Sequence, residues 1–335
     1  MAEREETILA PGGAFGTYHV LRPLGKGGAG EVFLVEDGVS HANYAVKVLD
    51  PGIASEDPGY VARFVREAEF ALNSRHPNVV AVHDAGKDPD TGLCYIVMDY
   101  LPGGTLRDLL RESPRGLSIE GVLSIARDVA RALAFVESRG LVHRDVKPEN
   151  ILFGRDGAAR LADLGATRSE RDGQDTLRVT RAEAVVGTPA YMAPEQMLDS
   201  HAADSRSDVY SLGVVMYEMI SGRRPNDGET AMSTLAKALG GRSFPDVRTF
   251  RPDAPPALAA LVAAMTATDP AQRPASGREV LELLANPERI SPPAPYSPPA
   301  VPWYRDRSVL FAVAALVLAC CALAVAVYNA LEGGR

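Results

Sequence analysis

The sequence predicts an α+β protein with a small β-rich N-terminal part, a larger α-helical C-terminal part and a single transmembrane helix near the C-terminus. Short runs of β-branched and aromatic residues, bounded by glycine or aspartate, dominate residues 17–100. Helical periodicity of the apolar residues dominates residues 101–286. The run 309–328 is apolar and uncharged, and at about 1.5 Å per residue a helix of that length crosses the hydrocarbon layer of a bilayer.

The composition is that of a globular protein whose main partner is not nucleic acid. Of the 335 residues, 46% are hydrophobic and 23% charged, and the formal net charge is −8, whereas a phosphate backbone calls for basic patches. The cysteines Cys94, Cys320 and Cys321 lack metal-ligand spacing, and two of them lie inside the apolar run. They therefore indicate neither a zinc site nor a disulfide framework, which fits a reducing compartment. The acidic residues 1–13 have no apolar core and are not expected to act as a signal peptide.

Five strands and one helix are expected in the N-terminal part, after an N-terminal extension of residues 1–16. Residues 57–74 place apolar side chains at helical spacing, among them Val61, Phe64 and Ala68. The expected strands cover residues 18–24, 31–36, 43–49, 79–83 and 94–100.

Six helices are expected in the C-terminal part. Thr105 and Ser118 are predicted N-caps, because a hydroxyl at that position accepts a free backbone N–H. The expected helices cover residues 105–112, 118–139, 207–221, 230–239, 257–266 and 277–284. Residues 287–308 are expected to form a linker, because the seven prolines in 287–302 favour an extended polyproline conformation.

The flanks of the apolar run 309–328 predict its orientation in the membrane. Aromatic residues that favour the membrane interface lie at its two ends, at Trp303, Tyr304 and Tyr328. Arg305 and Arg307 precede it, and the positive-inside tendency therefore places residues 1–308 in the cytoplasm. Residues 329–335 would form a short extracytoplasmic tail.

Residues 143–150, His-Arg-Asp-Val-Lys-Pro-Glu-Asn, contain groups that phosphoryl transfer needs. Asp145 can accept the proton of a substrate hydroxyl, and Lys147 can neutralise charge on the moving phosphoryl group. Asn150 can hold Mg²⁺ through its amide oxygen. The alternative interpretation is a charged turn, because these residue types are common in loops.

Two features of the N-terminal part indicate a nucleotide site. The glycine-rich run 25–30 lies between two expected strands, and glycine lets backbone amides approach phosphate oxygens. In dinucleotide-binding folds a helix follows such a run, whereas here a strand follows, which favours a flap over a nucleotide. Lys47 lies in an apolar strand, where an inward-facing lysine needs an anion as its partner.

Four further motifs follow in order, at residues 163–165 (Asp-Leu-Gly), 193–195 (Ala-Pro-Glu), 207–213 (Ser-Asp-Val-Tyr-Ser-Leu-Gly) and 269–274 (Asp-Pro-Ala-Gln-Arg-Pro). With the glycine run, the lysine and the loop 143–150, they make residues 17–286 resemble the eukaryotic-like (Hanks-type) protein kinases, and most closely the bacterial transmembrane serine/threonine kinases. The resemblance implies a bilobal protein-kinase fold, with an N-lobe of residues 17–100, a C-lobe of residues 101–286 and ATP between them.

The resemblance also assigns the phosphate and metal ligands. Lys47 would bind the α- and β-phosphates of ATP and pair with a helix glutamate, Glu67, with Glu69 as the rival. Asp163 would hold Mg²⁺ (or Mn²⁺) together with Asn150, and carboxylate and amide oxygens suit such an ion.

The nucleotide pocket implied by the resemblance has a flap, apolar walls and a hinge. Backbone groups of Asp99 and Leu101 would bind the base. The flap consists of Gly25, Lys26, Gly27, Gly28, Ala29 and Gly30. The adenine would lie among Leu24, Val32, Ala45, Met98 and Leu152.

Three contacts of the C-lobe are implied as well. Thr188 would support the aspartate and lysine of the loop 143–150, and this threonine with that lysine is the serine/threonine pattern. Asp208 would anchor the backbone of the loop from inside the lobe. Glu195 would pair with Arg273.

Residues 163–195 correspond in the resemblance to the activation segment, with Leu164 where the family usually carries phenylalanine. Arg144 would pair with a phosphate on this segment. We predict Thr176 and Thr180 as autophosphorylation sites.

The resulting prediction is a membrane-anchored kinase of the cell (inner or plasma) membrane that transfers the γ-phosphate of ATP to serine and threonine hydroxyls of proteins. The small-residue spacing of Ala315 with Ala319 is compatible with a homodimer that phosphorylates itself in trans.

Two alternative functions make different predictions about which of these motifs are present. A pseudokinase that binds ATP without transfer would lack one of Lys47, Asp145, Asn150 and Asp163. A small-molecule kinase of related fold would lack the motifs at 193–195 and 269–274.

Overall fold

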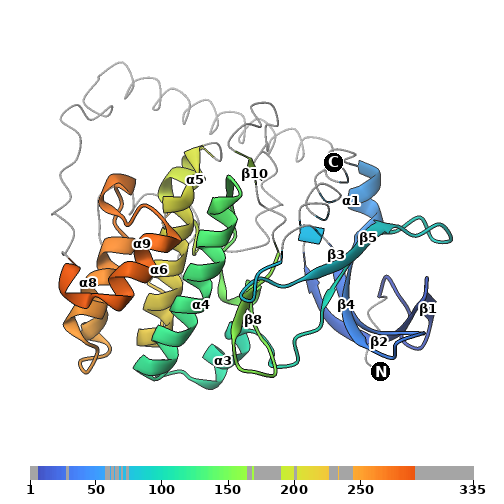
Figure 1. The fold of residues 1–335 in the computed structure, drawn as a ribbon, viewed down its shortest axis with the longest axis horizontal. Helices are drawn as coiled ribbons and strands as arrows, with labels where there is room; N and C mark the ends of the chain where they lie inside the picture. The colour runs from blue at the N-terminus through green and yellow to red at the C-terminus, as the bar shows by residue number, and fades with distance from the viewer. Residues whose placement is uncertain are drawn as a thin grey trace, which may run out of the picture. The chain divides into compact units, whose positions relative to one another are not determined.

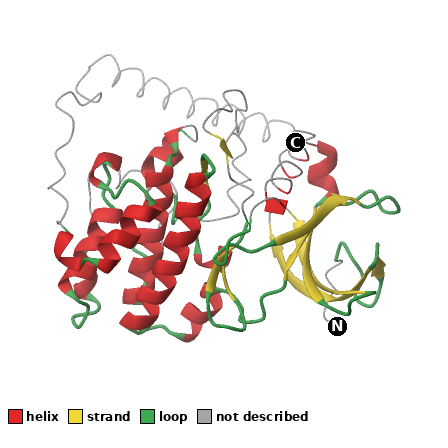
Figure 2. Cartoon of the chain, viewed as in Figure 1, coloured by secondary structure: helices red, strands yellow, loops and turns green. Residues whose placement is uncertain are grey.

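The structure is a computed structural model in which the described residues all fall within one unit, residues 1–294. The described residues are 7–27, 30–56, 61, 64, 68, 71–72, 75–163, 168–169, 190–199, 202–225, 233 and 244–290. Strands and helices are largely segregated along the chain, with the sheet in the N-terminal part and most helices in the C-terminal part (Figures 1 and 2).

A six-stranded antiparallel sheet forms the N-lobe, in the strand order β1-β2-β3-β4-β6-β5. Its strands are β1 (Ala14–Phe15), β2 (Tyr18–Gly27), β3 (Gly30–Asp37), β4 (Asn43–Leu49), β5 (Val82–Lys87) and β6 (Cys94–Asp99). The strands expected at 18–24, 31–36, 43–49 and 94–100 are therefore confirmed to within a few residues. The short β1 and the helix α1 (Pro51–Glu56) were not expected.

The register of the sheet separates two faces. Directly opposed residues share a face, so Val32, Lys47 and Ile96 lie together on one side of the sheet. Residues 61, 64, 68, 71 and 72 are helical within the expected helix 57–74. Phe64 and Ala68 of that helix pack with Leu49 and Ile96, on the same face as Lys47.

The opposite face of the sheet holds a second apolar cluster that includes part of the N-terminal extension. Phe33, Val46 and Val97 are fully buried there, and Leu9 and Phe15 pack against them. Leu9 and Phe15 thus cover part of the apolar surface that the sheet presents on this side.

The strand expected at 79–83 is wrong in its position, because β5 begins at Val82 and ends at Lys87. Val79 and Val80 instead bond to the C-lobe: Val79 forms a parallel bridge with Leu161, and the Val80 N–H donates to the Leu161 carbonyl at 3.0 Å. The β-branched residues Val79 and Val80 do form strand-like backbone pairing, but their partner, Leu161, lies far along the chain. The residues that form β5 are mostly polar or small and gave little strand signal.

Six α-helices are described in the C-lobe: α3 (Leu106–Glu112), α4 (Ile119–Ser138), α5 (Pro194–Leu198), α6 (Ser205–Ser221), α8 (Pro256–Met265) and α9 (Gly277–Ala285). The predicted caps are confirmed, since the Thr105 side chain accepts the Asp108 N–H and the Ser118 side chain accepts the Gly121 N–H. Of the helix expected at 230–239, only residue 233 is described.

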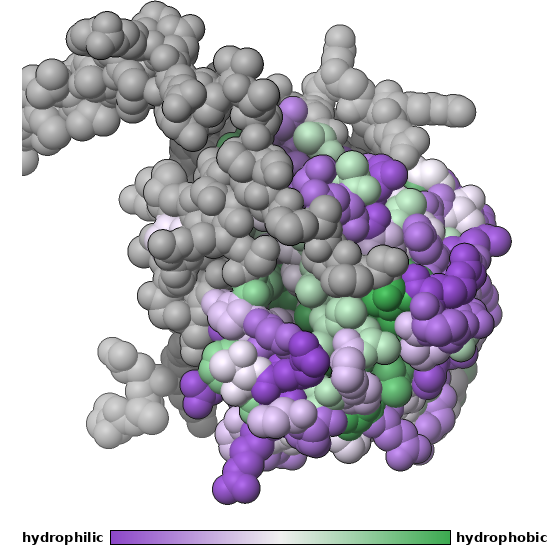
Figure 3. Space-filling model, turned by 90° about the vertical axis from the view of Figure 1, so that its left-hand side faces the viewer, coloured by the Kyte–Doolittle hydropathy of each residue, from purple (hydrophilic) through white to green (hydrophobic). Residues whose placement is uncertain are grey.

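Helix α6 is the centre of the C-lobe and is buried from Ser207 to Ser221. It begins two residues earlier than expected, because the Asp204 side chain caps it by accepting the Arg206 N–H. Gly213 permits close packing with α8, since a Cβ at that position would lie 2.8 Å from the Cβ of Met265. Figure 3 shows the face on the side of α8, where an apolar area lies beside hydrophilic residues.

Short strands and 3₁₀ turns complete the described elements after residue 140. They are β7 (Leu141–Val142), β8 (Ile151–Phe153), β9 (Ala159–Leu161), β10 (Arg168–Ser169), η1 (Pro148–Asn150), η4 (Val247–Thr249), η5 (Pro270–Gln272) and η6 (Pro287–Arg289). β7 pairs with β10, and β8 pairs with β9.

Within the described ranges, no helix is long and apolar enough to cross a membrane. The run 309–328, its tail 329–335 and residues 291–308 of the linker lie outside the described residues.

Candidate active site

The loop 143–150 is held from inside the C-lobe by Asp208, near the start of α6. Its two carboxylate oxygens accept the backbone N–H groups of His143 and Arg144, each at 2.7 Å. Burial raises the pKa of the Asp208 carboxyl above its ordinary range, and the two hydrogen bonds offset only part of that rise. Arg144 has a φ of +69°, so the loop turns through the left-handed region at this residue. The predicted anchoring contact is therefore present.

Asp145, Lys147 and Asn150 meet at one point of the loop. The Lys147 Nζ lies 2.7 Å from the Asp145 Oδ2, and the Asn150 Nδ2 donates to the same oxygen at 2.9 Å. The Asn150 Nδ2 also donates to the Asp145 carbonyl at 2.8 Å. Because both amide hydrogens face Asp145, the amide oxygen of Asn150 is directed to other partners. The 3₁₀ turn η1 brings Asn150 back to Asp145, five residues earlier in the chain.

His143 joins this loop to the segment that follows β9. The Asp145 N–H donates to the His143 Nδ1 at 3.3 Å, and the His143 Nε2 lies 3.1 Å from the Ala162 carbonyl. Nδ1 therefore acts as the acceptor and Nε2 carries the proton, which is the neutral tautomer that satisfies both contacts. The ring is fully buried, and it fixes the distance between Asp145 and the residue next to Asp163.

Lys47 of β4 forms an ion pair with Asp163, with 2.5 Å between Nζ and Oδ1. The two residues are 116 positions apart and come from different lobes, so this pair brings the N-lobe lysine to the C-lobe loops. Burial raises the pKa of Asp163, but the Lys47 ammonium lowers it by more, and the net pKa lies below the ordinary value. Asp163 is therefore ionised at neutral pH. Its φ of +62° is the second left-handed value in the site.

The residues present fit a divalent cation of the Mg²⁺ type. Such an ion takes oxygen ligands and is usually held by one or two carboxylates with other oxygens supplied by phosphates and water. Asp163 provides an ionised carboxylate, and Asn150 provides an amide oxygen that its own hydrogen bonds leave unused.

The sheet register gathers part of the predicted nucleotide pocket around Lys47. Val32 lies opposite Lys47, and Ala45, two residues before Lys47, lies opposite Met98. β2 and β3 form the flap hairpin, in which Gly25 pairs with Val32 and Gly27 with Gly30. Lys26 in this hairpin pairs with Glu31 at 3.0 Å.

The remaining pocket residues come from the flap edge and from the connection to the C-lobe. Leu24 is partly exposed on β2, and Asp99 ends β6. Leu101 is buried just after it, and Leu152 lies on β8 beside Thr105. Contact of these residues with a nucleotide stays a prediction.

Several predicted site residues lie outside the described residues, so their roles also stay predictions. They are Gly28, Ala29, Glu67, Leu164, Thr176, Thr180 and Thr188.

The predicted pair of Glu195 and Arg273 is present. Arg273 donates to both Glu195 oxygens, at 2.7 and 2.9 Å, and the Ser207 hydroxyl donates to the same carboxylate at 2.7 Å. Burial raises the pKa of Glu195, but the hydrogen bonds and charge of Arg273 lower it by more, so the net pKa lies below the ordinary value. The next residue, Gln196, donates to the Arg144 carbonyl at 2.8 Å. This contact ties the Ala-Pro-Glu motif to the loop 143–150.

A second polar cluster near the loop was missed by sequence reasoning. Arg107 of α3 donates to Glu149 and to Glu218 of α6, each at 2.8 Å, and to the Tyr191 hydroxyl, which in turn donates to Glu218. Burial lowers the pKa of Arg107, but its bonds to the two glutamates raise it by more. Burial, followed by the charge of Glu218, raises the pKa of Tyr191. The cluster fixes the residues around Tyr191 against the same helix that carries Asp208.

Comparison with known proteins gives a match over most of the chain. The family model described as "Protein kinase domain" matches residues 18–286. The serine/threonine-protein kinase PknB of Mycolicibacterium smegmatis is 37% identical over 282 residues, which cover 83% of this chain and 44% of that relative. The serine/threonine-protein kinase PknA of Mycobacterium tuberculosis is 35% identical over 299 residues, covering 86% of this chain and 67% of the relative.

A relative from another bacterial group shows the same similarity. The serine/threonine-protein kinase PrkC of Bacillus subtilis is 33% identical over 258 residues, which cover 77% of this chain and 38% of the relative. The chain thus spans less than half the length of the PknB and PrkC relatives that it matches.

Proposed function

The chain belongs to the protein kinase family, and we propose that it transfers the γ-phosphate of ATP to serine and threonine hydroxyls of proteins. The observation that carries this proposal is that Lys147 and Asn150 both lie within hydrogen-bond distance of the same Asp145 carboxylate oxygen. The bacterial relatives whose names specify serine/threonine-protein kinases support the class of acceptor.

In this function Asp145 orients the substrate hydroxyl and accepts its proton. Assistance of that kind contributes about 10²–10⁴-fold to a rate, and the greater part of the acceleration comes from positioning and charge stabilisation. Lys147, 2.7 Å from Asp145, neutralises charge on the phosphoryl group. Asn150 and Asp163 hold Mg²⁺ (or Mn²⁺), which supplies positive charge for the phosphates.

Lys47 and the flap hairpin position the nucleotide. Lys47 binds the α- and β-phosphates, and Glu67 is its proposed partner on the helix that packs against the same face of the sheet. The adenine lies between Ala45 of the N-lobe and Leu152 of the C-lobe, with the backbone of residues 99–101 as its hydrogen-bonding edge.

The proposal is tested with Asp145→Asn in the chain of residues 1–335, with labelled ATP and myelin basic protein as substrate. We expect loss of transfer with retained ATP binding, whereas Asp90→Asn, an exposed turn residue, should behave as wild type. Wild-type turnover in the Asp145→Asn protein would reject the mechanism. ATP binding without any transfer by the unsubstituted chain would support the pseudokinase alternative.

We further propose that residues 309–328 anchor the kinase in the cell membrane as a single span, with residues 17–286 as the kinase domain in the cytoplasm. The uncharged apolar run and the arginines at 305 and 307 support this arrangement. Residues 287–308 would be the linker. An alkaline carbonate wash of isolated membranes should leave the chain in the pellet, and its release into the supernatant would reject the span.

Autophosphorylation of residues 163–195 is the proposed control of the enzyme, with Thr176 and Thr180 as acceptors and Arg144 as the residue that pairs with the phosphate. Thr188 would contact the catalytic loop. Phosphopeptide mapping after incubation with ATP should find phosphate in this range, and its absence there would reject the proposal.

A homodimer formed through residues 309–328 would allow this reaction to occur in trans. Cross-linking in membranes tests it, and a purely monomeric pattern would contradict it.

A further inference from the structure

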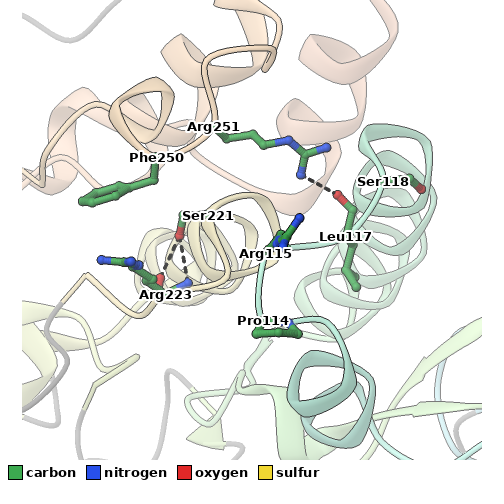
Figure 4. A pocket seen from close by; sticks show the side chains of 9 residues that line it. Pro114, Arg115, Leu117, Ser118, Ser221, Arg223, Phe250 and Arg251 are labelled. Carbon is green, nitrogen blue, oxygen red and sulfur yellow. Dashed lines mark hydrogen bonds between the residues drawn. The ribbon is translucent and has the colours of Figure 1, made fainter.

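A pocket of about 490 Å³ lies in the C-lobe, away from the proposed phosphotransfer site (Figure 4). It is bordered by the turn before α4, by the C-terminal end of α6 and by the segment after η4, which contribute Ser118, Ser221 and Phe250 among others. Asp208 and Ser221 lie 13 residues apart on α6, or about 20 Å at 1.5 Å per residue. The pocket is therefore at the opposite end of α6 from the residue that anchors the loop 143–150.

Three arginines line this pocket, and one of them is rigidly held. Arg251 donates to the Leu117 carbonyl at 2.9 Å and to the Asp253 carboxylate at 2.8 Å. These bonds fix its guanidinium on the pocket wall, as Figure 4 shows for the contact with Leu117.

The other two arginines, Arg115 and Arg223, are exposed and make no ion pair within the described part of the chain. The Arg223 guanidinium lies 5.3 Å from the centre of the Phe250 ring, a cation–π contact that orients it without neutralising it. The described residues that line the pocket include these three arginines and no acidic residue, and only Arg251 is paired with a described carboxylate, that of Asp253, so the lining carries a positive charge.

The N-terminal end of α4 adds to this charge. Ser118 caps this helix of 20 residues and lines the pocket. The N-terminal end of a helix carries a partial positive charge, which favours a bound anion. The Ser118 side chain is used by the cap, so its contribution is to hold the end of the helix at the pocket.

The ligand class follows from these groups. Arginines from separate segments can each bind different oxygens of a phosphate monoester, which has three acceptor oxygens and a charge near −2. Phe250, 41% exposed, offers an apolar contact at the rim that a free phosphate ion would leave unused. A phosphorylated side chain that has an apolar neighbour in a peptide can contact both the arginines and Phe250.

We propose that this pocket binds a phosphorylated serine or threonine in a peptide segment, as a docking site separate from the phosphotransfer site. The proposed kinase function would explain the origin of the phosphate, but binding at the pocket does not depend on catalysis.

The test uses the dephosphorylated chain of residues 1–335 and a short fluorescent peptide, Ala-Glu-Leu-Thr-Leu-Glu-Ala, with and without phosphate on its threonine. By fluorescence anisotropy we expect the phosphorylated peptide to bind at least about tenfold more tightly than the unphosphorylated one. Exchange of both exposed arginines, Arg115→Gln with Arg223→Gln, should remove this difference. Arg278→Gln, an exposed arginine of α9 outside the pocket, is the matched control.

Three results would overturn the proposal: equal affinity for the two peptides, unchanged affinity in the doubly substituted protein, or inorganic phosphate that competes as strongly as the phosphopeptide. The last result would mean a site for the ion alone. Activity of the doubly substituted protein toward myelin basic protein is measured in parallel. If the unsubstituted chain shows no kinase activity, the result counts against the proposed function but does not affect the binding result.

Discussion

Arg273 holds Glu195 through two parallel hydrogen bonds, of 2.7 and 2.9 Å, although the two residues are 78 positions apart. The Arg273 side chain is 0% exposed, so its charge has been removed from water and is balanced inside the lobe. Its guanidinium also donates to the carbonyls of Ala267 and Thr268, and the Tyr210 ring lies 4.7 Å away. The pair connects the motif at 193–195 to the motif at 269–274.

Arg273→Ala should therefore destabilise the C-lobe strongly, because it leaves a largely buried carboxylate without its cation. Removal of one partner of a buried pair costs about 3–5 kcal/mol. Urea unfolding followed by circular dichroism measures the change. Arg111→Ala is the control, because its pair with Asp108 is exposed and should contribute little. Similar unfolding midpoints for the two substituted proteins would contradict the expectation.

The lowered pKa of Glu195 predicts a pH-dependent contribution to stability. A carboxyl whose pKa is lower in the folded state stabilises the fold above its unfolded pKa, near the ordinary value of 4.5, and this contribution is lost as the pH falls through the folded value. The difference in unfolding free energy between wild type and Glu195→Gln should thus be largest above pH 4.5 and shrink below it. Unfolding curves on both sides of pH 4.5 measure the difference. A constant difference over this range would contradict the prediction.

Asp208→Asn should lower turnover on the order of 10²-fold, because a small displacement of a reacting group has an effect of that size. In Asp208→Asn an NH2 donor replaces one of the two accepting oxygens, so the hydrogen bond from either the His143 or the Arg144 backbone N–H is lost. Steady-state kinetics should show the loss in kcat with little change in the KM for ATP. Asp204→Asn on the same helix keeps a good N-cap residue and should retain activity. An equal effect on kcat and KM would argue against a role in positioning.

Leu9→Ala should destabilise the protein by about 2–5 kcal/mol, the usual range for deletion of a buried leucine side chain. Leu9 is 7% exposed against the sheet, although it lies before the first expected strand. Leu21→Ala is the matched control, since Leu21 is 43% exposed on β2. Thermal unfolding of both proteins gives the comparison. An equal effect of the two substitutions would mean that residues 7–10 do not stabilise the lobe.

The sequence predicted those contacts of the site for which either the chemistry of nearby residues or a family motif indicates the partner. Asp145, Lys147 and Asn150 are within six positions, so a tight turn suffices to join them. The pairs of Asp208 with the loop and of Arg273 with Glu195 followed from family resemblance. Runs of β-branched and aromatic residues predicted most strands, and Thr105 and Ser118 marked the starts of two helices.

The parts that sequence missed depend on contacts between distant segments with no local pattern. Arg107 reaches partners 42, 84 and 111 positions away, and nothing around it distinguishes it from a surface arginine of a helix. Its position on α3 is compatible with exposure, and only its contacts with Glu149, Tyr191 and Glu218 in other segments enclose it. The shift from 79–83 to β5 has the same cause, because Val79 and Val80 pair with a strand of the other lobe.

Three non-glycine residues of the described chain have a positive φ, and two of them, Arg144 at +69° and Asp163 at +62°, belong to the candidate site. An L-residue in this region costs roughly 1–2 kcal/mol, which glycine would not incur. Selection of variants for heat resistance alone should therefore enrich glycine at these two positions, while selection for phosphate transfer should restore the native side chains. Two positions of the candidate site, 19 residues apart, thus carry a side chain in a backbone region that costs stability, so the thermal tolerance of this protein is set in part by its chemistry.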